Sequence, residues 1–145
     1  MDTYPHLTNE PQTEPDWFEA LTNLARFLRT PEGCPWDREQ SAHDFAQYAV
    51  GETEEYVEAL AKPEPNRKDQ EHTAEEFGDA LFTLLASAAA AEEEGRFAIQ
   101  DALQAAHQKM IRRHDHVFGE TKATTPEEAE QAWEKAKAKE KAGES

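Results

Sequence analysis

Residues 80–91 read ALFTLLASAAAA, an uncharged run in a chain of which 32% of the residues are charged. A helix that is apolar on every side is buried on every side, so this run predicts the central helix of the fold. The helix is expected to extend from about Gln70 to Glu94, because Gly95 is a natural stop at a helix C-terminus. The sequence thus predicts a fold built around one buried helix.

Capping signals and helical periodicity predict further helices on both sides of this one. Ser41 and Asp44 make a capping box before one helix, while Thr125, Pro126 and Glu128 mark the start of another. No segment alternates apolar and polar residues as a strand would. The expected helices cover residues 16–28, 42–61, 70–94, 99–117 and a segment that starts at 126. The predicted fold class is therefore all-α.

Length and composition predict the domain organisation. The chain has 145 residues and a mass of 16.4 kDa, which is the size of one domain. Residues 1–13 carry little periodicity and contain prolines, so they are expected to form a flexible N-terminal arm. Residues 14–142 are expected to form a single domain.

The charge of the chain limits its partners. There are 31 acidic residues against 15 basic ones, which gives a net charge of -16. Such a surface repels phosphate backbones, so nucleic-acid binding is disfavoured. No run of about 18 apolar residues is present, so no membrane span is expected, and the single Cys34 suits a reducing cytoplasm. A small anionic ligand would need metal ions or a local group of basic residues.

Two glutamates fall on the apolar side of the expected helix 42–61. Its buried face is predicted, from steps of four and seven, to contain Phe45, Ala49, Tyr56 and Ala59. Glu52 falls inside this stripe, and Glu55 lies at its edge. Glu54 and Glu58 fall on the other side and are expected to be solvated. The position of Glu52 and Glu55 therefore requires an explanation other than ordinary surface charge.

A second pair of acids, Glu76 and Asp79, lies at the start of the uncharged run. A buried carboxylate without a partner is unfavourable by several kcal/mol, so such groups either protonate or recruit cations. Oxygen ligands at i, i+3 on two neighbouring helices suit Mg²⁺ or Mn²⁺ better than zinc. The sequence predicts a metal site made of Glu52, Glu55, Glu76 and Asp79, the alternative being plain surface charge on a Glu-rich protein.

Several motifs follow one another between Leu21 and Lys141: GCPWDREQS, the two acidic segments, EEEGRF, KMIRRHDHVFG and AWEKAKAKEK. In these motifs and their order the chain resembles the MazG-type nucleoside triphosphate pyrophosphohydrolases. The resemblance implies a helical bundle with a core of about four helices plus an additional C-terminal helix, assembled as a homodimer or a larger homo-oligomer. It also implies Mg²⁺-dependent cleavage of a nucleoside triphosphate between the α and β phosphates, giving a monophosphate and pyrophosphate, with removal of surplus nucleotides as the role.

The acidic signature of the family is E-E-x-x-E followed by E-x-x-D. A literal match to its first part, EEYVE, is rejected because the family string continues into a small residue and Leu, as EYVEAL does here. In the register that remains, Glu52 and Glu55 are followed by Glu76 and Asp79. Gly51 then stands where the family has its first glutamate, which is a departure from the pattern.

The resemblance also assigns basic and aromatic residues near the C-terminus. Lys109 and Arg113 match residues that contact phosphate, and they are expected to act in catalysis together with Glu52 and Glu55. The residues expected to bind the nucleotide are Lys109, Arg112, Arg113, Trp133 and Lys137. Guanidinium and ammonium groups neutralise phosphate oxygens, and an indole can stack on a base.

Two alternatives to a general pyrophosphohydrolase stay open at this point. One is a related all-α enzyme with a narrow substrate choice, such as a dUTPase-like or phosphoribosyl-ATP pyrophosphohydrolase. The other is a catalytically silent module that binds metal or nucleotide, which the glycine at position 51 favours. A panel of nucleotides scored for pyrophosphate release separates the first alternative from the general enzyme, and nucleotide binding without turnover identifies the second.

Overall fold

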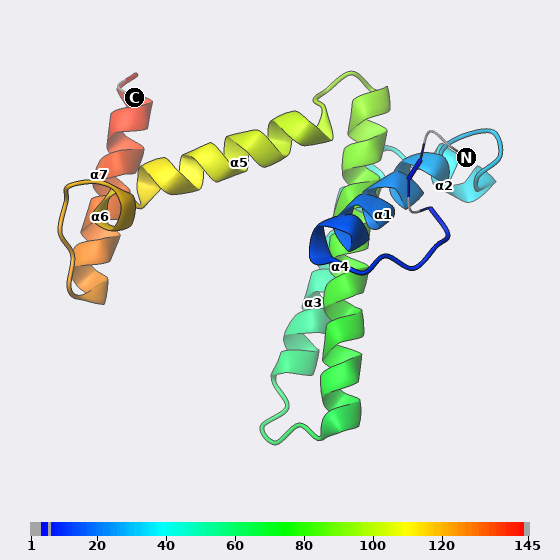
Figure 1. Ribbon diagram of the computed structural model, residues 1–145, viewed down its shortest axis with the longest axis horizontal. Coiled ribbons are helices and arrows are strands. Elements are labelled where there is room, and N and C mark those ends of the chain that lie inside the picture. The colour runs from blue at the N-terminus through cyan, green and yellow to red at the C-terminus, as the bar shows by residue number, and fades with distance from the viewer. Residues whose placement is uncertain (1–3, 6, 144–145) are drawn as a thin grey trace. The chain divides into compact units, whose positions relative to one another are not determined.

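The computed structural model describes residues 4–5 and 7–143 and is all-α, as predicted (Figure 1). The part of the expected arm that covers residues 1–3 and 6 lies outside the described residues. The helices are α1 (Glu14–Phe27), α2 (Pro35–Glu39), α3 (Ala42–Leu60), α4 (Arg67–Glu93), α5 (Ile99–Arg113), α6 (Asp115–Phe118) and α7 (Pro126–Lys141). Two compact units, residues 1–99 and 100–145, divide the chain and are described separately.

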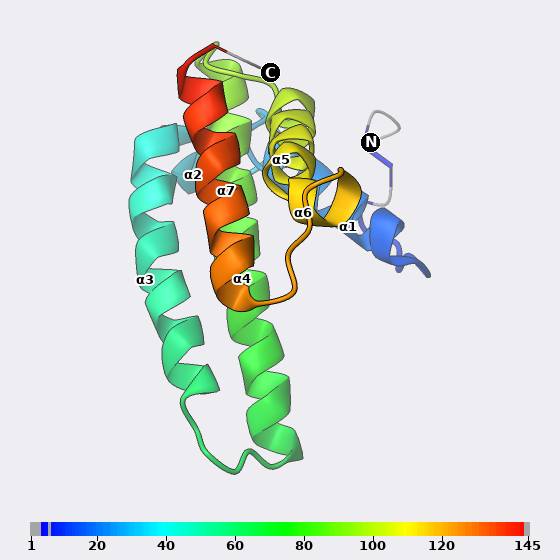
Figure 2. The same cartoon turned by 90° about the vertical axis from the view of Figure 1, so that its left-hand side faces the viewer.

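The first unit is organised around the long helix α4. Helices α3 and α4 lie side by side in both views, joined by a loop at one end, and α1 packs on α4 (Figures 1 and 2). The contacts are made largely by small side chains, because Ala86, Ala90 and Ala91 of α4 cluster with Ala42 and Phe45 of α3. Alanine has no side-chain bulk beyond Cβ, so these helix backbones can approach closely.

A second cluster joins α1 to α4. Ala25 of α1 packs with Leu85 and Ala89 of α4, and larger apolar residues cover them from outside: Phe18, Leu21, Leu81 and Phe82. Helical spacing predicts an apolar stripe on α1 that contains Trp17, Leu21, Leu24 and Leu28. The buried face differs from this stripe, because Trp17 is 49% exposed while Thr22 and Asn23 are buried. The Thr22 hydroxyl donates to the Phe18 carbonyl, and the Asn23 side-chain amide donates to the Pro5 carbonyl. These bonds satisfy the polar groups that burial would otherwise leave unpaired.

The caps of α3 and α4 fix where these helices begin. The predicted box of Ser41 and Asp44 is present, with both reciprocal hydrogen bonds formed. A second box, made by Asn66 and Asp69, starts α4 three residues earlier than expected. Asn66 follows the prolines that end the preceding helix, so this segment looks like part of the loop in the sequence. Gly95 has φ 73° just beyond α4, so its predicted role as the stop is confirmed.

Two expected boundaries are wrong. The loop between the first two expected helices contains the short helix α2, which Pro35 initiates because proline fits the first helical position. The helix predicted for residues 99–117 is broken at His114, whose φ of -108° and ψ of 45° are not helical. Its last part is therefore the separate helix α6.

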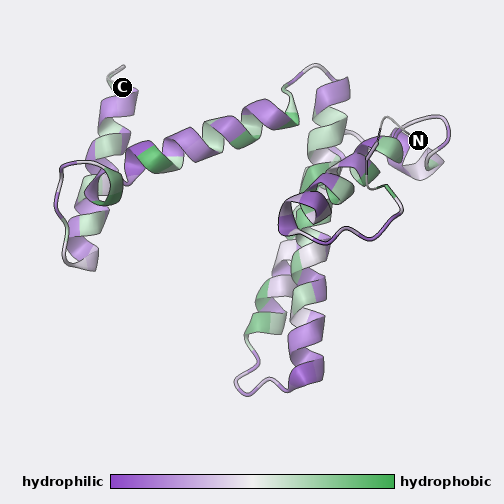
Figure 3. Ribbon diagram, in the orientation of Figure 1, coloured by the Kyte–Doolittle hydropathy of each residue, from purple (hydrophilic) through white to green (hydrophobic). Residues whose placement is uncertain are grey.

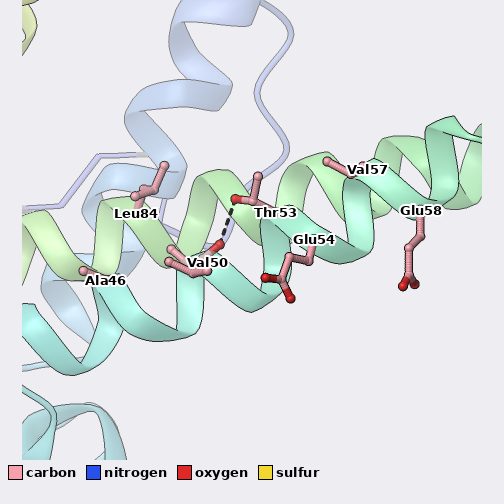
Figure 4. A pocket seen from close by; sticks show the side chains of 8 residues that line it. Ala46, Val50, Thr53, Glu54, Val57, Glu58 and Leu84 are labelled. Carbon is pink, nitrogen blue, oxygen red and sulfur yellow. Dashed lines mark hydrogen bonds between the residues drawn. The ribbon is translucent and has the colours of Figure 1, made fainter.

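The expected all-round burial of residues 80–91 is also wrong within this chain. Leu84 is 52% exposed although Leu85 and Ala86 beside it are buried. Leu84 lines a shallow apolar groove of about 600 Å³ along α3, together with Val50 and Val57 (Figure 4). In Figure 3 the first turns of α4 are mostly purple and its middle is pale to green, which corresponds to the uncharged run at residues 80–91.

In the second unit α6 packs on α7, and α5 joins them through charged and aromatic contacts. Arg113 of α5 donates from Nη2 to Glu140 Oε2 at 2.9 Å, and its guanidinium lies 5.2 Å from the centre of the Trp133 ring. Thr125 caps α7 as predicted by accepting from the Glu128 backbone amide, whereas the Glu128 side chain accepts from Thr124 instead of closing the box. Within the described part of the chain no helix is long and apolar enough to cross a membrane.

Candidate functional site

The facing sides of α3 and α4 carry a cluster of carboxylates. One carboxylate oxygen from each of Glu52, Glu76 and Asp79 lies within 4.8 Å of the others. Glu52 comes from α3, where it follows the buried Ala49 by one turn, and the other two come from one turn of α4. The antiparallel pairing of the two helices therefore brings together acids that are 27 residues apart in sequence, from Glu52 to Asp79.

The fourth predicted acid, Glu55, is exposed but belongs to the same electrostatic group. Partial burial raises the pKa of the Glu52 carboxyl, and the neighbouring charge of Glu55 raises it further. The pKa of Glu76 is raised in the same way, first by partial burial and then by Glu55, while His72 opposes the shift. The charge of Asp79 also contributes to both shifts, so Glu52 and Glu76 each interact with Glu55 and with Asp79.

Glu52 and Glu76 are partly buried, whereas Asp79 is exposed, and Glu76 has one oxygen that is cut off from donors in the described part of the chain. Its side chain is 13% exposed, and within the described residues its Oε2 atom is buried without a hydrogen-bond partner. Its other oxygen, Oε1, lies 3.5 Å from His72 Nε2, which is long for a hydrogen bond. A buried carboxylate oxygen that lacks a hydrogen-bond donor is unfavourable. The Oε2 atom of Glu76 is therefore the strongest indication that the cluster binds a cation.

The chemistry of the donors fits a hard divalent cation. The cluster offers only carboxylate oxygens, and no thiolate lies in it, which suits Mg²⁺ or Mn²⁺. Glu54 and Glu58 are exposed, as predicted, and Glu54 lines the apolar groove (Figure 4). The helix pair brings Glu52, Glu76 and Asp79 together, whereas Glu55 acts on Glu52 and Glu76 through its charge without joining that group.

A groove beside the cluster contains residues that sequence reasoning missed. It has a volume of about 430 Å³ and runs from Glu55 and Glu76 toward the loop between α3 and α4. Lys62 lines it and pairs with Asp69 at 2.8 Å, and His72 lines it one turn before Glu76. The i, i+4 spacing of His72 and Glu76 was a signal that could have identified the histidine.

The predicted basic residues lie in the second unit. Arg112 and Arg113 both pair with Glu140, and Arg113 also covers the Trp133 ring, so the structure brings these three predicted residues together. Lys137 is half-buried on α7, one turn after Trp133, and Lys109 is exposed on α5, one turn before Arg113. His114 packs edge-on against Trp133, with 5.3 Å between the ring centres, and is a further neighbour of this group.

Comparison with known proteins gives a consistent result. Residues 40–118 match the model of the MazG nucleotide pyrophosphohydrolase domain. Over 124 residues, 86% of this chain, it is 38% identical to the nucleoside triphosphate pyrophosphohydrolase/pyrophosphatase MazG of Thermotoga maritima, and over 125 residues it is 39% identical to the nucleoside triphosphate pyrophosphohydrolase of Escherichia coli K12. It is also 37% identical to the protein YabN of Bacillus subtilis.

These matches cover only part of each relative. The matched region spans 45% of the Thermotoga protein, 46% of the Escherichia protein and 24% of YabN. No solved structure shows a significant match to the chain.

The raised pKa values predict how stability depends on pH. A carboxyl whose folded-state pKa is raised stabilises the fold below its unfolded pKa, and this contribution is lost as pH rises through the folded pKa. For Glu52 and Glu76 the loss begins above the ordinary value of 4.5. We expect metal-free Glu76→Gln to have a higher melting temperature than wild type at pH 7. The melting temperature of this variant should also fall less than that of wild type between pH 5 and pH 7.

Thermal unfolding with and without Mg²⁺ checks this expectation. Wild type should gain stability with Mg²⁺, and Glu76→Gln should gain less. Glu54→Gln is the matched control because it removes one exposed carboxylate from the same helix pair. If Glu54→Gln and Glu76→Gln respond alike, net charge and not the cluster governs the effect.

Proposed function

Because the chain belongs to the MazG nucleotide pyrophosphohydrolase domain family, we propose that it hydrolyses nucleoside triphosphates between the α and β phosphates, releasing a monophosphate and pyrophosphate. The observation that carries the proposal is the cluster of Glu52, Glu76 and Asp79, in which one buried oxygen of Glu76 has no hydrogen-bond donor among the described residues. The proposed cofactor is Mg²⁺, with Mn²⁺ as a substitute, since the ligands are all oxygens. The proposed biological role is removal of surplus or aberrant nucleotides in the cytoplasm.

In this proposal Glu52, Glu55, Glu76 and Asp79 hold the metal. A divalent ion bound there would neutralise phosphate charge and lower the pKa of a bound water. The carboxylates themselves position the ion on two helices that are fixed against each other, so little reorganisation is needed when substrate arrives. Partial burial of Glu76 strengthens the electrostatic contacts of its own carboxylate.

The basic residues of the second unit are proposed to bind the nucleotide. Arg113 is held between Glu140 and the Trp133 ring, so its guanidinium is oriented before any substrate binds. We propose that Lys109 and Arg113 stabilise the charge that develops on the pyrophosphate leaving group. Arg112 and Lys137 are assigned to the remaining phosphate contacts, and Trp133 to the base, on the family resemblance.

We further propose that a second copy of this chain covers the apolar groove of α3. Val50 is 61% exposed, Val57 59% and Leu84 52%, and all three line the same groove. An exposed apolar patch of this kind marks an interface more often than free surface, and the two-fold dimer is the commonest assembly of identical chains.

The reaction is tested by its products and by two substitutions. With Mg²⁺ and a nucleoside triphosphate, we expect monophosphate and pyrophosphate, and release of orthophosphate would refute the cleavage position. Glu55→Gln and Asp79→Asn should each lower kcat more than about tenfold, which corresponds to roughly 1.4 kcal/mol, because each removes a ligand charge. Glu54→Gln is the control and should keep wild-type turnover, since Glu54 lies on another side of α3.

Position 51 gives a second test. No atom lies within 4 Å of where a Cβ on Gly51 would stand, so a larger side chain fits without displacing a neighbour. Glycine within a helix is about 1 kcal/mol less favourable than alanine. We expect Gly51→Glu to tighten Mg²⁺ binding and raise turnover, while Gly51→Ala should stabilise the fold only. Turnover against Mg²⁺ concentration for both variants measures this, and equal profiles would show that water activation does not involve this position.

The assembly is tested by mass. Light scattering at micromolar concentration should give at least twice the 16.4 kDa of one chain. Leu84→Lys should shift the mass toward one chain, because a charge in the groove opposes its burial, whereas Phe97→Lys should not, since Phe97 is an exposed apolar residue that does not line the groove. A wild-type mass near that of one chain would exclude the dimer.

A further inference from the structure

The charge of the chain is distributed unequally between its two units. Residues 1–99 contain 22 of the 31 acidic residues and 7 of the 15 basic ones. Residues 100–145 contain the other 9 acidic residues and the other 8 basic ones. The second unit therefore has a net charge of only -1 in a chain of net charge -16. Anions are repelled by the first unit and are expected to reach the second one preferentially.

A cavity of about 270 Å³ lies within this second unit. Its walls come from the end of α5, from α6, from the loop that follows it and from α7. The cations that line it are Arg112, Lys135 and Lys139, and the carboxylates are Asp115 and Glu140. The hydroxyl of Thr121 and the methyl groups of Ala132 and Ala136 complete the lining.

The carboxylates of the cavity are already engaged. Asp115 accepts a hydrogen bond from the Thr121 hydroxyl. Glu140 is shared between two guanidiniums, since Arg112 Nε lies 3.2 Å from Oε1 and Arg113 Nη2 lies 2.9 Å from Oε2. Lys135 and Lys139 have no ion-pair partner within 4.0 Å among the residues that the structure describes. The cavity thus has more positive than negative charge.

These lysines do not belong to the proposed nucleotide contacts. Residues advance by about 100° around a helix, so Lys135 and Lys139 share one side of α7 while Trp133 and Lys137 share a side roughly 160° away. Two lysines one turn apart repel each other, and a bound anion would remove that repulsion. Lysine near a helix C-terminus is also favourable by itself, but that effect does not require both side chains to line one cavity.

We propose that this cavity binds a small inorganic phosphate anion, of the size of orthophosphate or pyrophosphate, between Arg112, Lys135 and Lys139. Its volume equals roughly nine waters at about 30 Å³ each, and it falls just below the range of about 300–1,000 Å³ that is typical for larger organic ligands. The Thr121 hydroxyl donates to Asp115 and so engages one of the two carboxylates at this wall. The site shares no residue with the carboxylate cluster, and it shares only Arg112 with the proposed nucleotide contacts.

Calorimetric titration of the full chain with pyrophosphate, in buffer without divalent metal, tests the proposal. Lys135→Gln/Lys139→Gln should weaken pyrophosphate binding at least tenfold. Lys68→Gln/Lys141→Gln removes the same charge from exposed residues outside the cavity and should change affinity less than twofold. Lys135→Arg/Lys139→Arg keeps the charge and should bind like wild type, which distinguishes lost binding from lost folding.

Further titrations identify the anion and separate this site from the proposed active site. Lys109→Gln alters a proposed contact to the leaving group and therefore reports on pyrophosphate that binds at the proposed active site instead of in this cavity. Loss of binding in Lys109→Gln but not in Lys135→Gln/Lys139→Gln would overturn the proposal, as would equal loss in the Lys68 and Lys141 control. Orthophosphate should bind more weakly than pyrophosphate because it reaches fewer of the cations, and tighter binding of a nucleoside monophosphate would overturn the assignment to an inorganic anion.

Discussion

The register between α3 and α4 depends on two hydrogen bonds at Ala42. The backbone amide of Ala42 donates to Glu94 Oε2 at 2.8 Å, and its carbonyl accepts from Ser87 Oγ at 2.7 Å. The first residue of α3 is thus fixed to α4 by both of its backbone groups, which a helix N-terminus would otherwise leave partly unpaired. A slide of one helix along the other would break both bonds.

This register decides which acids meet. At about 1.5 Å per residue, Glu52 lies roughly 15 Å along α3 from Ala42, while Asp79 and Glu76 lie roughly 12 and 16 Å along α4 from Ser87. The position of Glu52 therefore falls between those of the two α4 acids. The alanines near Ala42 allow the helix backbones to approach, so three carboxylates come within 4.8 Å of one another without any loop being involved.

Features that depend on residue spacing within one helix could be predicted from the sequence. Features that depend on contact with a second helix could not. The capping box at Ser41, the inward position of Glu52 and the stop at Gly95 were predicted because each follows from a few adjacent residues. The exposure of Leu84 was not, since composition alone cannot say which side of an apolar helix lacks a neighbour in one chain. Likewise, the link between Arg112, Arg113 and Glu140 joins residues 27 and 28 apart, and no local pattern predicts it.

The acidic first unit imposes an order on the binding events that we propose. Without a cation, the charges of Glu55 and Asp79 raise the pKa of Glu52 and that of Glu76, and a triphosphate would add further negative charge. A nucleotide approaching alone is therefore repelled at the cluster, whereas a nucleotide that arrives as its metal complex is attracted. The unpaired oxygen of Glu76 favours the same order, because it gains a partner only when a cation enters. Recognition at this site is accordingly expected to act on the metal–triphosphate complex before it acts on the base.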